Sequence, residues 1–299
     1  MLARTSAALA LTILAAAFGP RTLAASLDAY AYGIDVQSAC ATSGPTPNIT
    51  ATGLNLLAIP FQSPPCTAGQ LLKVKTSSSK PANVVSIIAG AGDSSFGHWT
   101  ESGSSRGLAG FGALTARAQS TLTGHGDGAT RVGHESFARF ADTLTIKNGA
   151  GAGLAHLVIT ITGIATASAR GTGEISLNVW ENTNPNATEA TRLTLSNGAW
   201  TLRNDGAYQS LVAPLPAGVV KLKRGFRLTA LTAHLDLPFS YGVPSNLRAL
   251  LYTSAAAGYG DTASILDFTA NATLSSIRVD GNPAPVIVTG SGAIYPIIP

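Results

Sequence analysis

The sequence predicts an all-β protein: an antiparallel, jelly-roll-like β-sandwich with an irregular, disulfide-closed N-terminal segment. Apolar and polar residues alternate over many short stretches, which is the two-residue period of a strand with one buried face. Clusters of Gly, Pro, Asn and Ser separate these stretches about every 8 to 15 residues, as in sandwiches and jelly rolls. Charged residues make up only 11% of the chain, against about 25% in an average soluble protein. Polar uncharged residues must therefore cover the surface, which is typical of an extracellular β protein.

Residues 1–25 have the pattern of a secretory signal peptide: Arg4, an apolar run from Ala7 to Phe18, and small residues at Ala24 and Ala25. The apolar run is shorter than the roughly 20 residues that span a bilayer. We therefore expect export to the periplasm or the medium, with no membrane span after cleavage. Cleavage after Ala25 leaves 274 of 299 residues and a formal charge of +2 instead of +4. So small an excess of cations gives no basic surface for nucleic acid.

The N-terminal part, residues 26–105, is expected to hold short strands and a disulfide-closed loop. Cys40 and Cys66 are the two cysteines of the chain, and in an oxidising compartment we expect them to pair; free reactive thiols are the alternative. A loop of this length would gain about 3.5 kcal/mol from closure. The expected strands are Tyr30–Val36, Leu54–Phe61, Leu71–Lys75 and Val84–Ile88.

Residues 106–299 are expected to form the sandwich, continuous with the preceding segment as one domain. Leu114–Leu122 alternates as a half-buried strand. Gly124–Glu135 is glycine-rich and reads as a loop. The strands Phe140–Ile146 and Leu157–Ile161 flank a second glycine-rich turn, which favours a hairpin.

The second half of the sandwich shows the clearest patterns. In Glu174–Trp180 the residues Ile, Leu and Val are expected to point inward, and Glu174, Ser176 and Asn178 outward. Asn197-Gly198 predicts a tight hairpin between the strands Arg192–Ser196 and Ala199–Arg203. The alternation changes parity between Ala230 and Leu231, which predicts a β-bulge.

Asp261–Val279 is expected to be a buried strand pair or one long bent strand. Ala272 and Leu274 share a parity that Ile277 and Val279 do not, so the strand should bend or bulge at Ser275-Ser276. We interpret this bend as a corner of the sandwich. Helical signals are slight: only Ala187–Leu193 and Ser254–Ala257 could form a turn or two.

Two sets of residues are candidates for hydrolysis. Gly103–Gly107 matches the G-x-S-x-G pattern of a nucleophile elbow, with Ser105 as the nucleophile. The residues after it read as a strand and not as the required helix, which favours a Ser/Gly-rich segment without catalysis. His234 and Asp236 lie two apart in a strand and share one face, so Asp236 could orient His234 for acid–base chemistry. A simple solvent-facing pair explains the same spacing.

No metal or cofactor site is predicted. His125, Asp127, His134 and Glu135 are all of types that bind metals, but they match no recognised ligand spacing, and solvated loop residues explain them as well. Sugar stacking by exposed aromatic side chains is a further candidate, against ordinary packing; the residues concerned are Tyr30, Tyr32, Trp99, Trp180 and Trp200. Glycosylation sequons begin at Asn48, Asn186 and Asn271.

The phrases FSYGVP, ILDFTANATLSSIRV and VIVTGSGAIYP, from Phe239 onward, resemble the C-terminal part of the ectodomains of bacterial PEP-CTERM secreted proteins. The resemblance covers about 55 residues and implies a bacterial exported β-sandwich associated with extracellular polysaccharide or cell-surface layers. It carries over no catalytic residue. The chain lacks the family's sorting tail of a Pro-Glu-Pro triplet, a spanning helix and basic residues, so release is expected instead of anchoring.

The expected function is that of an exported non-catalytic β-sandwich with a structural or ligand-binding role at the bacterial envelope or in the extracellular matrix. Polysaccharide is the candidate ligand, and no nucleic-acid partner is expected. The alternative is a secreted hydrolase that uses His234 and Asp236, or Ser105.

Overall fold

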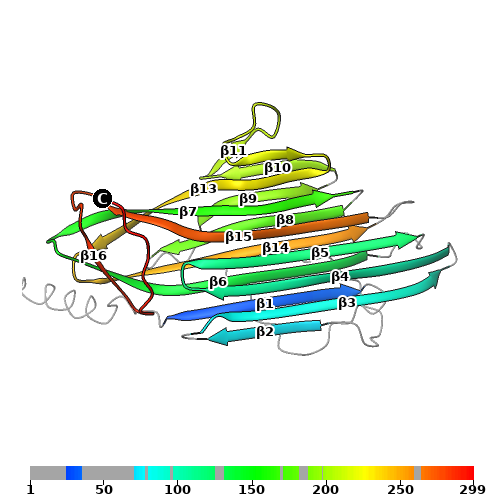
Figure 1. Ribbon diagram of the computed structural model, residues 1–299, viewed down its shortest axis with the longest axis horizontal. Helices are drawn as coiled ribbons and strands as arrows, with labels where there is room; N and C mark the ends of the chain where they lie inside the picture. The colour runs from blue at the N-terminus through cyan, green and yellow to red at the C-terminus, as the bar shows by residue number, and fades with distance from the viewer. Residues whose placement is uncertain are drawn as a thin grey trace, which may run out of the picture.

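Two antiparallel β-sheets make up the protein in the computed structural model (Figure 1). The structure describes residues 25–35, 71–77, 80–94, 97–124, 131–168, 171–181, 188–196, 198–258 and 264–299. Within these ranges no helix is long and apolar enough to cross a membrane. The predicted all-β class and the face-to-face sheets of a sandwich are confirmed. The predicted signal peptide, the strand Leu54–Phe61 and both cysteines lie outside the described residues.

Sheet A has nine strands in the order β11-β10-β9-β8-β14-β6-β1-β2, with β16 also paired to β6. Its strands are β1 (Ser26–Asp35), β2 (Leu71–Ser77), β6 (Arg131–Lys147), β8 (Gly171–Glu181), β9 (Thr188–Ser196), β10 (Ala199–Asn204), β11 (Ala207–Gln209), β14 (Pro244–Gly258) and β16 (Val286–Thr289).

Sheet B has seven strands in the order β12-β13-β7-β15-β5-β4-β3. Its strands are β3 (Ala82–Ser94), β4 (Gly97–Gly110), β5 (Ala113–Gly124), β7 (Ala152–Ala167), β12 (Val219–Leu222), β13 (Gly225–Ser240) and β15 (Ser264–Val279). Strands from both sides of residue 105 therefore contribute to both sheets.

The core lies between the sheets and is built from the apolar members of each alternating strand. Phe268 of β15 packs so closely on Gly173 of β8 that a Cβ at Gly173 would lie 2.2 Å from its ring. Trp200 of β10 stacks on Phe268, with ring centroids 5.8 Å apart, and meets Phe226 edge-on at 5.5 Å. Trp200 therefore belongs to the packing between the sheets and not to an exposed sugar platform.

Both predicted bulges are confirmed. The β13–β7 register shifts between Leu228 and Leu231, where Thr229 and Ala230 are both exposed. The β15–β7 register shifts between Leu274 and Ser276. The Asn197-Gly198 hairpin is confirmed as well, since β9 and β10 pair directly.

Several expectations about connections were wrong. The strands Phe140–Ile146 and Leu157–Ile161 do not form a hairpin, because β6 lies in sheet A and β7 in sheet B. The glycine-rich turn between them reverses the chain across the sandwich instead of within one sheet. β15 is not a corner: it stays in sheet B, paired with β5 from Ser264 to Thr273 and with β7 from Leu266 to Val279 on both sides of the bulge.

Three short segments also differ from expectation. The sequence indicated that residues 188–193 and 254–257 could form a helical turn. They lie in the strands β9 and β14 instead. The expected loop Gly124–Glu135 is shorter, because β6 already begins at Arg131. Pairing with neighbouring strands overrides the weak local helix propensity of these segments.

Candidate binding face of sheet A

The outer face of sheet A consists of the side chains of this sheet that point away from sheet B. In β8 the residues Ile175, Leu177 and Val179 point into the core, as predicted, so Glu174, Ser176, Asn178 and Trp180 point outward. These outward residues are nevertheless buried, Ser176 with only 1% of its surface exposed. A buried polar surface requires hydrogen-bond partners, so the contacts of this face are informative.

Strand register places the outward residues of neighbouring strands in rows across the sheet. One row holds Thr194 of β9, Glu174 of β8, Ser254 of β14 and Glu135 of β6. The next row holds Arg192, Ser176, Tyr252 and Phe137 of the same four strands. Residues far apart in the sequence therefore become direct cross-strand neighbours.

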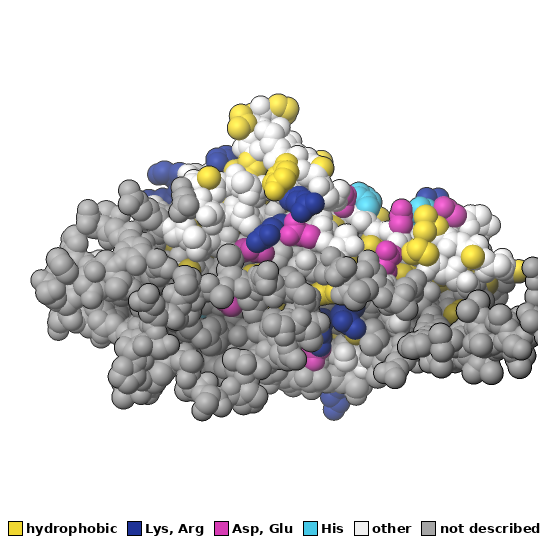
Figure 2. All heavy atoms as spheres, turned by 180° about the vertical axis from the view of Figure 1, so that it is seen from behind, with side chains coloured by type: hydrophobic (Ala, Val, Ile, Leu, Met, Phe, Trp, Pro, Cys, Tyr) yellow, Lys and Arg dark blue, Asp and Glu magenta, His cyan; other side chains and the backbone are white. Residues whose placement is uncertain are grey.

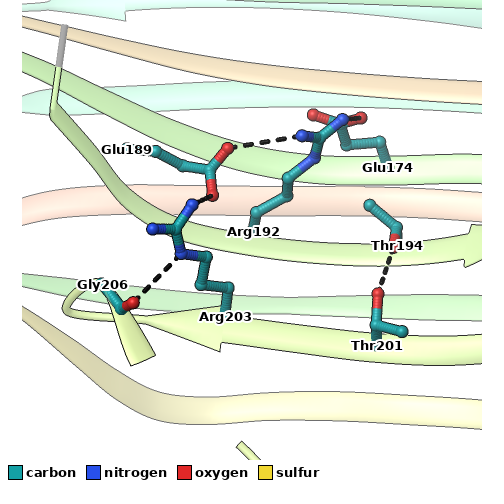
Figure 3. Close-up of polar contacts among 7 residues, drawn as sticks. All are labelled: Glu174, Glu189, Arg192, Thr194, Thr201, Arg203 and Gly206. Carbon is teal, nitrogen blue, oxygen red and sulfur yellow. Dashed lines mark hydrogen bonds and ion pairs between the residues drawn. The ribbon is translucent and has the colours of Figure 1, made fainter. Parts of the chain in front are cut away.

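A ladder of charges crosses β8, β9 and β10 (Figure 3). Arg192 Nη2 lies 3.0 Å from Glu174 Oε2, and its Nη1 lies 3.4 Å from Glu189 Oε2. Glu189 Oε1 lies 3.4 Å from Arg203 Nη1, and Arg203 Nε donates to the carbonyl of Gly206 at 3.1 Å. The side chains of Arg192 and Arg203 are 40% and 44% exposed, so the ladder is open to solvent at its β9–β10 end.

Two more cation contacts lie towards the opposite end of the outer face. Arg139 of β6 donates to Asp28 of β1, with Nε and Nη2 at 2.9 and 2.5 Å from the same carboxylate oxygen. The guanidinium of Arg248 in β14 lies 5.7 Å from the ring centre of Trp180. Trp180 is buried and lies against an arginine, an arrangement that stabilises both groups by a cation–π interaction.

The carboxyl group of Glu135 has an unusual proton affinity. Burial raises its pKa to about 7; the Tyr252 hydroxyl opposes this rise and the charge of Glu174 adds to it. Burial also raises the pKa of Tyr252 well above its ordinary value. Glu135 is therefore a carboxyl group that can hold a proton near neutral pH, whereas Glu174 faces the arginine ladder.

Among the described residues of the outer face, three buried polar atoms have no hydrogen-bond partner: Ser176 Oγ, Asn178 Nδ2 and Arg192 Nε. They belong to the neighbouring strands β8 and β9, and Arg192 and Ser176 are direct cross-strand neighbours. All three can donate a hydrogen bond. Because an unsatisfied buried donor costs about 1 to 3 kcal/mol, the group suits a ligand rich in hydroxyl or carboxylate oxygens.

Ser105 does not sit in a nucleophile elbow. It lies inside β4, fully buried, and β5 follows after a two-residue turn. The prediction that the residues after Gly107 form a strand and not a helix is therefore confirmed.

Ser120 and His134 form a serine–histidine contact inside the core, with Oγ and Nδ1 3.0 Å apart. The Ser120 hydroxyl donates to the carbonyl of Ala255 at 2.7 Å, so its proton does not point at the imidazole. Burial lowers the pKa of His134 to about 4. The contact is that of a neutral core histidine, shielded from any substrate.

His234 and Asp236 share the exposed face of β13, as the spacing predicts, but they do not pair with one another. His234 Nδ1 lies 2.7 Å from Asp205 Oδ2. Asp236 Oδ1 lies 2.6 Å from His156 Nδ1, and Asp280 Oδ2 lies 2.9 Å from the Nε2 of the same histidine. Hydrogen bonds that His156 donates to Asp280 and Asp236 raise the pKa of His156. The three residues therefore form an ion-pair cluster on the surface of sheet B.

The proposed metal ligands do not all converge. His134 and Glu135 are consecutive in β6, so their side chains point to opposite faces of sheet A, His134 towards Ser120 and Glu135 outward. No group of three or more His, Cys, Asp or Glu side chains that could hold a metal ion occurs in the described parts of the chain. His125, Asp127, Asn48, Asn186 and the side chains of Tyr30, Tyr32 and Trp99 lie outside what the structure describes. Asn271 is exposed and accepts a hydrogen bond from Thr115.

Sequence reasoning missed Arg192, Arg248 and Tyr252. The signal available for the outer face was the alternation of Glu174–Trp180, whose outward positions carry a carboxylate, an amide and an indole. The strands that complete the rows cannot be assigned from that stretch. No protein-family model, curated protein or solved structure matches the chain.

Proposed function

We propose that the protein is an exported, non-catalytic β-sandwich that binds polysaccharide through the outer face of sheet A. The observation that carries the proposal is the group of unpartnered donors at Ser176, Asn178 and Arg192, beside the exposed charge ladder. Sugar hydroxyl and carboxylate oxygens are acceptors of the kind that these donors require.

The proposal includes export after cleavage of residues 1–25, a jelly-roll-like sandwich, and a Cys40–Cys66 bridge in the N-terminal segment. It places the protein in the periplasm or outside the cell, at the envelope or in the matrix. The resemblance to PEP-CTERM secreted proteins and the low charge of the chain support this location.

The unpartnered hydroxyl group of Ser176 allows a test that separates binding from stability. Ser176→Ala removes a hydroxyl that has no hydrogen-bond partner among the described residues, so the midpoint of denaturant unfolding should stay the same or rise. If this hydroxyl binds sugar, the variant should be retained about fivefold more weakly on immobilised polysaccharides, since a neutral hydrogen bond contributes about 1 kcal/mol.

Ser120→Ala is the matched control, because the Ser120 hydroxyl is satisfied in the core. It should lower the unfolding midpoint and leave retention unchanged. Retention of the wild-type protein on no polysaccharide would leave only a structural role. Equal retention of wild type and Ser176→Ala would place the sugar site elsewhere.

Hydrolysis of a glycosidic bond is a second candidate function, favoured by Glu135 and Glu174, which lie in one cross-strand row of the outer face. Glycoside hydrolysis uses two carboxyl groups, one of which holds a proton near neutral pH, as Glu135 can. Glu135 would give its proton to the leaving oxygen as the C–O bond breaks, and Glu174 would take a proton from the water that forms the new C–O bond. Release of reducing ends from a polysaccharide by wild type, and not by Glu135→Gln, would establish this activity; equal inertness of both proteins would exclude it.

A further inference from the structure

The segment Gln209–Val219 projects from one edge of the sandwich, between β11 at the edge of sheet A and β12 at the edge of sheet B (Figure 1). Hydrophobic side chains gather at the tip of this projection (Figure 2). Val212 is 75% exposed, and Tyr208, in the strand that leads into the segment, is 82% exposed. Apolar side chains this exposed lack the burial that normally stabilises them.

The projection is fixed to the body of the protein. Leu211 and Leu215 pack against the core. The backbone N–H of Val212 donates to Ser210 Oγ at 3.2 Å, which shapes the tip. At the base, the N–H of Thr229 in the bulge of β13 donates to the carbonyl of Gly218 at 2.8 Å. The bulge thus anchors the loop that presents Val212.

Cations lie beside the projection along the same edge (Figure 2). Lys221, Lys223, Arg224 and Arg227 fall within residues 206–235, a stretch that contains no Asp or Glu. All four residues are exposed. Lys221 Nζ lies 4.1 Å from the ring centre of Phe226.

The acidic residues that flank this stretch do not neutralise it. Asp205 is paired with His234, and Asp236 with His156. The projection and the hairpin of β12 and β13 therefore combine an apolar tip with an excess of positive charge.

We propose that this edge docks onto an anionic lipid surface, with Val212 and Tyr208 entering the headgroup region and the cations of the β12–β13 hairpin contacting lipid phosphates. Tyrosine favours the membrane–water interface, and basic residues near an anionic leaflet add to the attraction. A polysaccharide offers the cations an anionic partner but gives Val212 no apolar phase, so the two features together select lipid. Tyr208 lies beside Arg203 of the charge ladder, with the guanidinium 5.9 Å from its ring centre, so this edge borders the outer face of sheet A. The inference does not depend on sugar binding.

Edge lysines have another established use, which is to discourage pairing between the edge strands of two molecules. Lys221 and Lys223 suit that role as well. It does not account for an exposed apolar tip on the same edge, and the two roles predict different results for the variants below.

Flotation of the purified protein with vesicles tests the proposal. Vesicles of phosphatidylcholine mixed with phosphatidylglycerol, an anionic lipid that gives the surface a negative potential, are compared with vesicles of pure phosphatidylcholine. The protein should float with the anionic vesicles only, and less at 0.5 M salt, because screening shortens the reach of the charges. Lys223→Gln and Arg224→Gln should each weaken binding about fivefold, and Val212→Asp at least as much.

Ile294→Asp is the matched control, since Ile294 is equally apolar, is exposed, and lies near the C-terminus, away from the cations. It should float like the wild type. The proposal is overturned if wild type binds neither vesicle, binds both equally, or binds as well after Val212→Asp. It is also overturned if the Gln variants self-associate in sedimentation velocity while their vesicle binding stays unchanged.

Discussion

At the residue scale, the most informative position is the pair His134–Glu135 in β6. Consecutive strand residues point to opposite faces, so one titratable side chain enters the core and the other the outer face of sheet A. Burial acts on them in opposite senses, since it disfavours the charged form of each. It lowers the pKa of His134 to about 4 and raises that of Glu135 to about 7.

The two shifts have opposite effects on stability as the pH changes. The pKa of Glu135 rises from 4.5 in the unfolded chain, so its contribution is complete below pH 4.5 and is lost as the pH rises through about 7. The pKa of His134 falls from 6.5, so its contribution is complete above pH 6.5 and is lost as the pH falls through about 4. Each contribution amounts to about 3 kcal/mol, and between pH 4.5 and 6.5 the two slopes offset one another.

We therefore expect that in Glu135→Gln the pH dependence of stability contributed by His134 is no longer offset. Its free energy of unfolding should rise by about 3 kcal/mol between pH 4 and 6.5, more steeply than that of the wild type. His134→Gln should show the reverse, a free energy that falls from pH 4.5 to 7. Urea denaturation at five pH values measures both slopes; parallel profiles for the wild type and the two variants would show that neither group is buried as described.

At the element scale, alternation was a sound guide to strands and to their faces. Leu114–Leu122 and Glu174–Trp180 lie in β5 and β8 with the expected residues inward. The parity changes near Ala230 and Ser275 located both bulges. These features are local, because a strand's own period determines which side chains share a face.

The partners of each strand could not be inferred in the same way. A glycine-rich turn reverses the chain but does not say whether the next strand joins the same sheet, and β6 and β7 join different sheets. A bulge bends a strand without moving it to another sheet, as β15 shows. Local sequence supplies a period and a turn, whereas strand order depends on contacts between distant segments.

The candidate binding face was also only partly predictable from the sequence. Alternation correctly directed Glu174, Ser176 and Asn178 outward, but their neighbours Arg192 and Tyr252 come from β9 and β14. Burial of the outward residues was not predicted either, since a period identifies a face and does not say how exposed that face is.

At the scale of the whole molecule, the C-terminal segment joins the two sheets. β16 pairs with β6 of sheet A, and Ser291 and Tyr295 then donate to the fully buried carboxylate of Asp142 in the same strand. Further on, the N–H of Ile277 in sheet B donates to the carbonyl of Pro296 at 2.8 Å, and Ile277 accepts from the N–H of Ile298 at 3.0 Å. The C-terminal segment therefore connects β6 of sheet A to β15 of sheet B by hydrogen bonds to both strands.

Asp142 is the centre of this bridge. Its carboxylate also accepts the N–H groups of Thr143 and Ser291, at 2.8 and 2.9 Å. The Tyr295 hydroxyl lies 2.7 Å from Oδ2, and burial, together with that hydrogen bond, raises the pKa of Tyr295 above its ordinary value. Hydrogen bonds to a charged acceptor contribute more than neutral ones.

Tyr295→Phe should therefore lower the global free energy of unfolding by about 1.5 to 3 kcal/mol, because it removes one donor from a buried carboxylate that helps to join the sheets. Tyr241→Phe is the control: the Tyr241 hydroxyl only accepts a long hydrogen bond of 3.4 Å from Asn282, so this variant should differ from wild type by less than about 0.5 kcal/mol. Urea denaturation measures both, and hydrogen exchange locates the change. If Tyr295→Phe speeds exchange only in Val286–Thr289 and leaves the unfolding midpoint unchanged, the C-terminal segment is a peripheral addition to sheet A and the sandwich holds together without it.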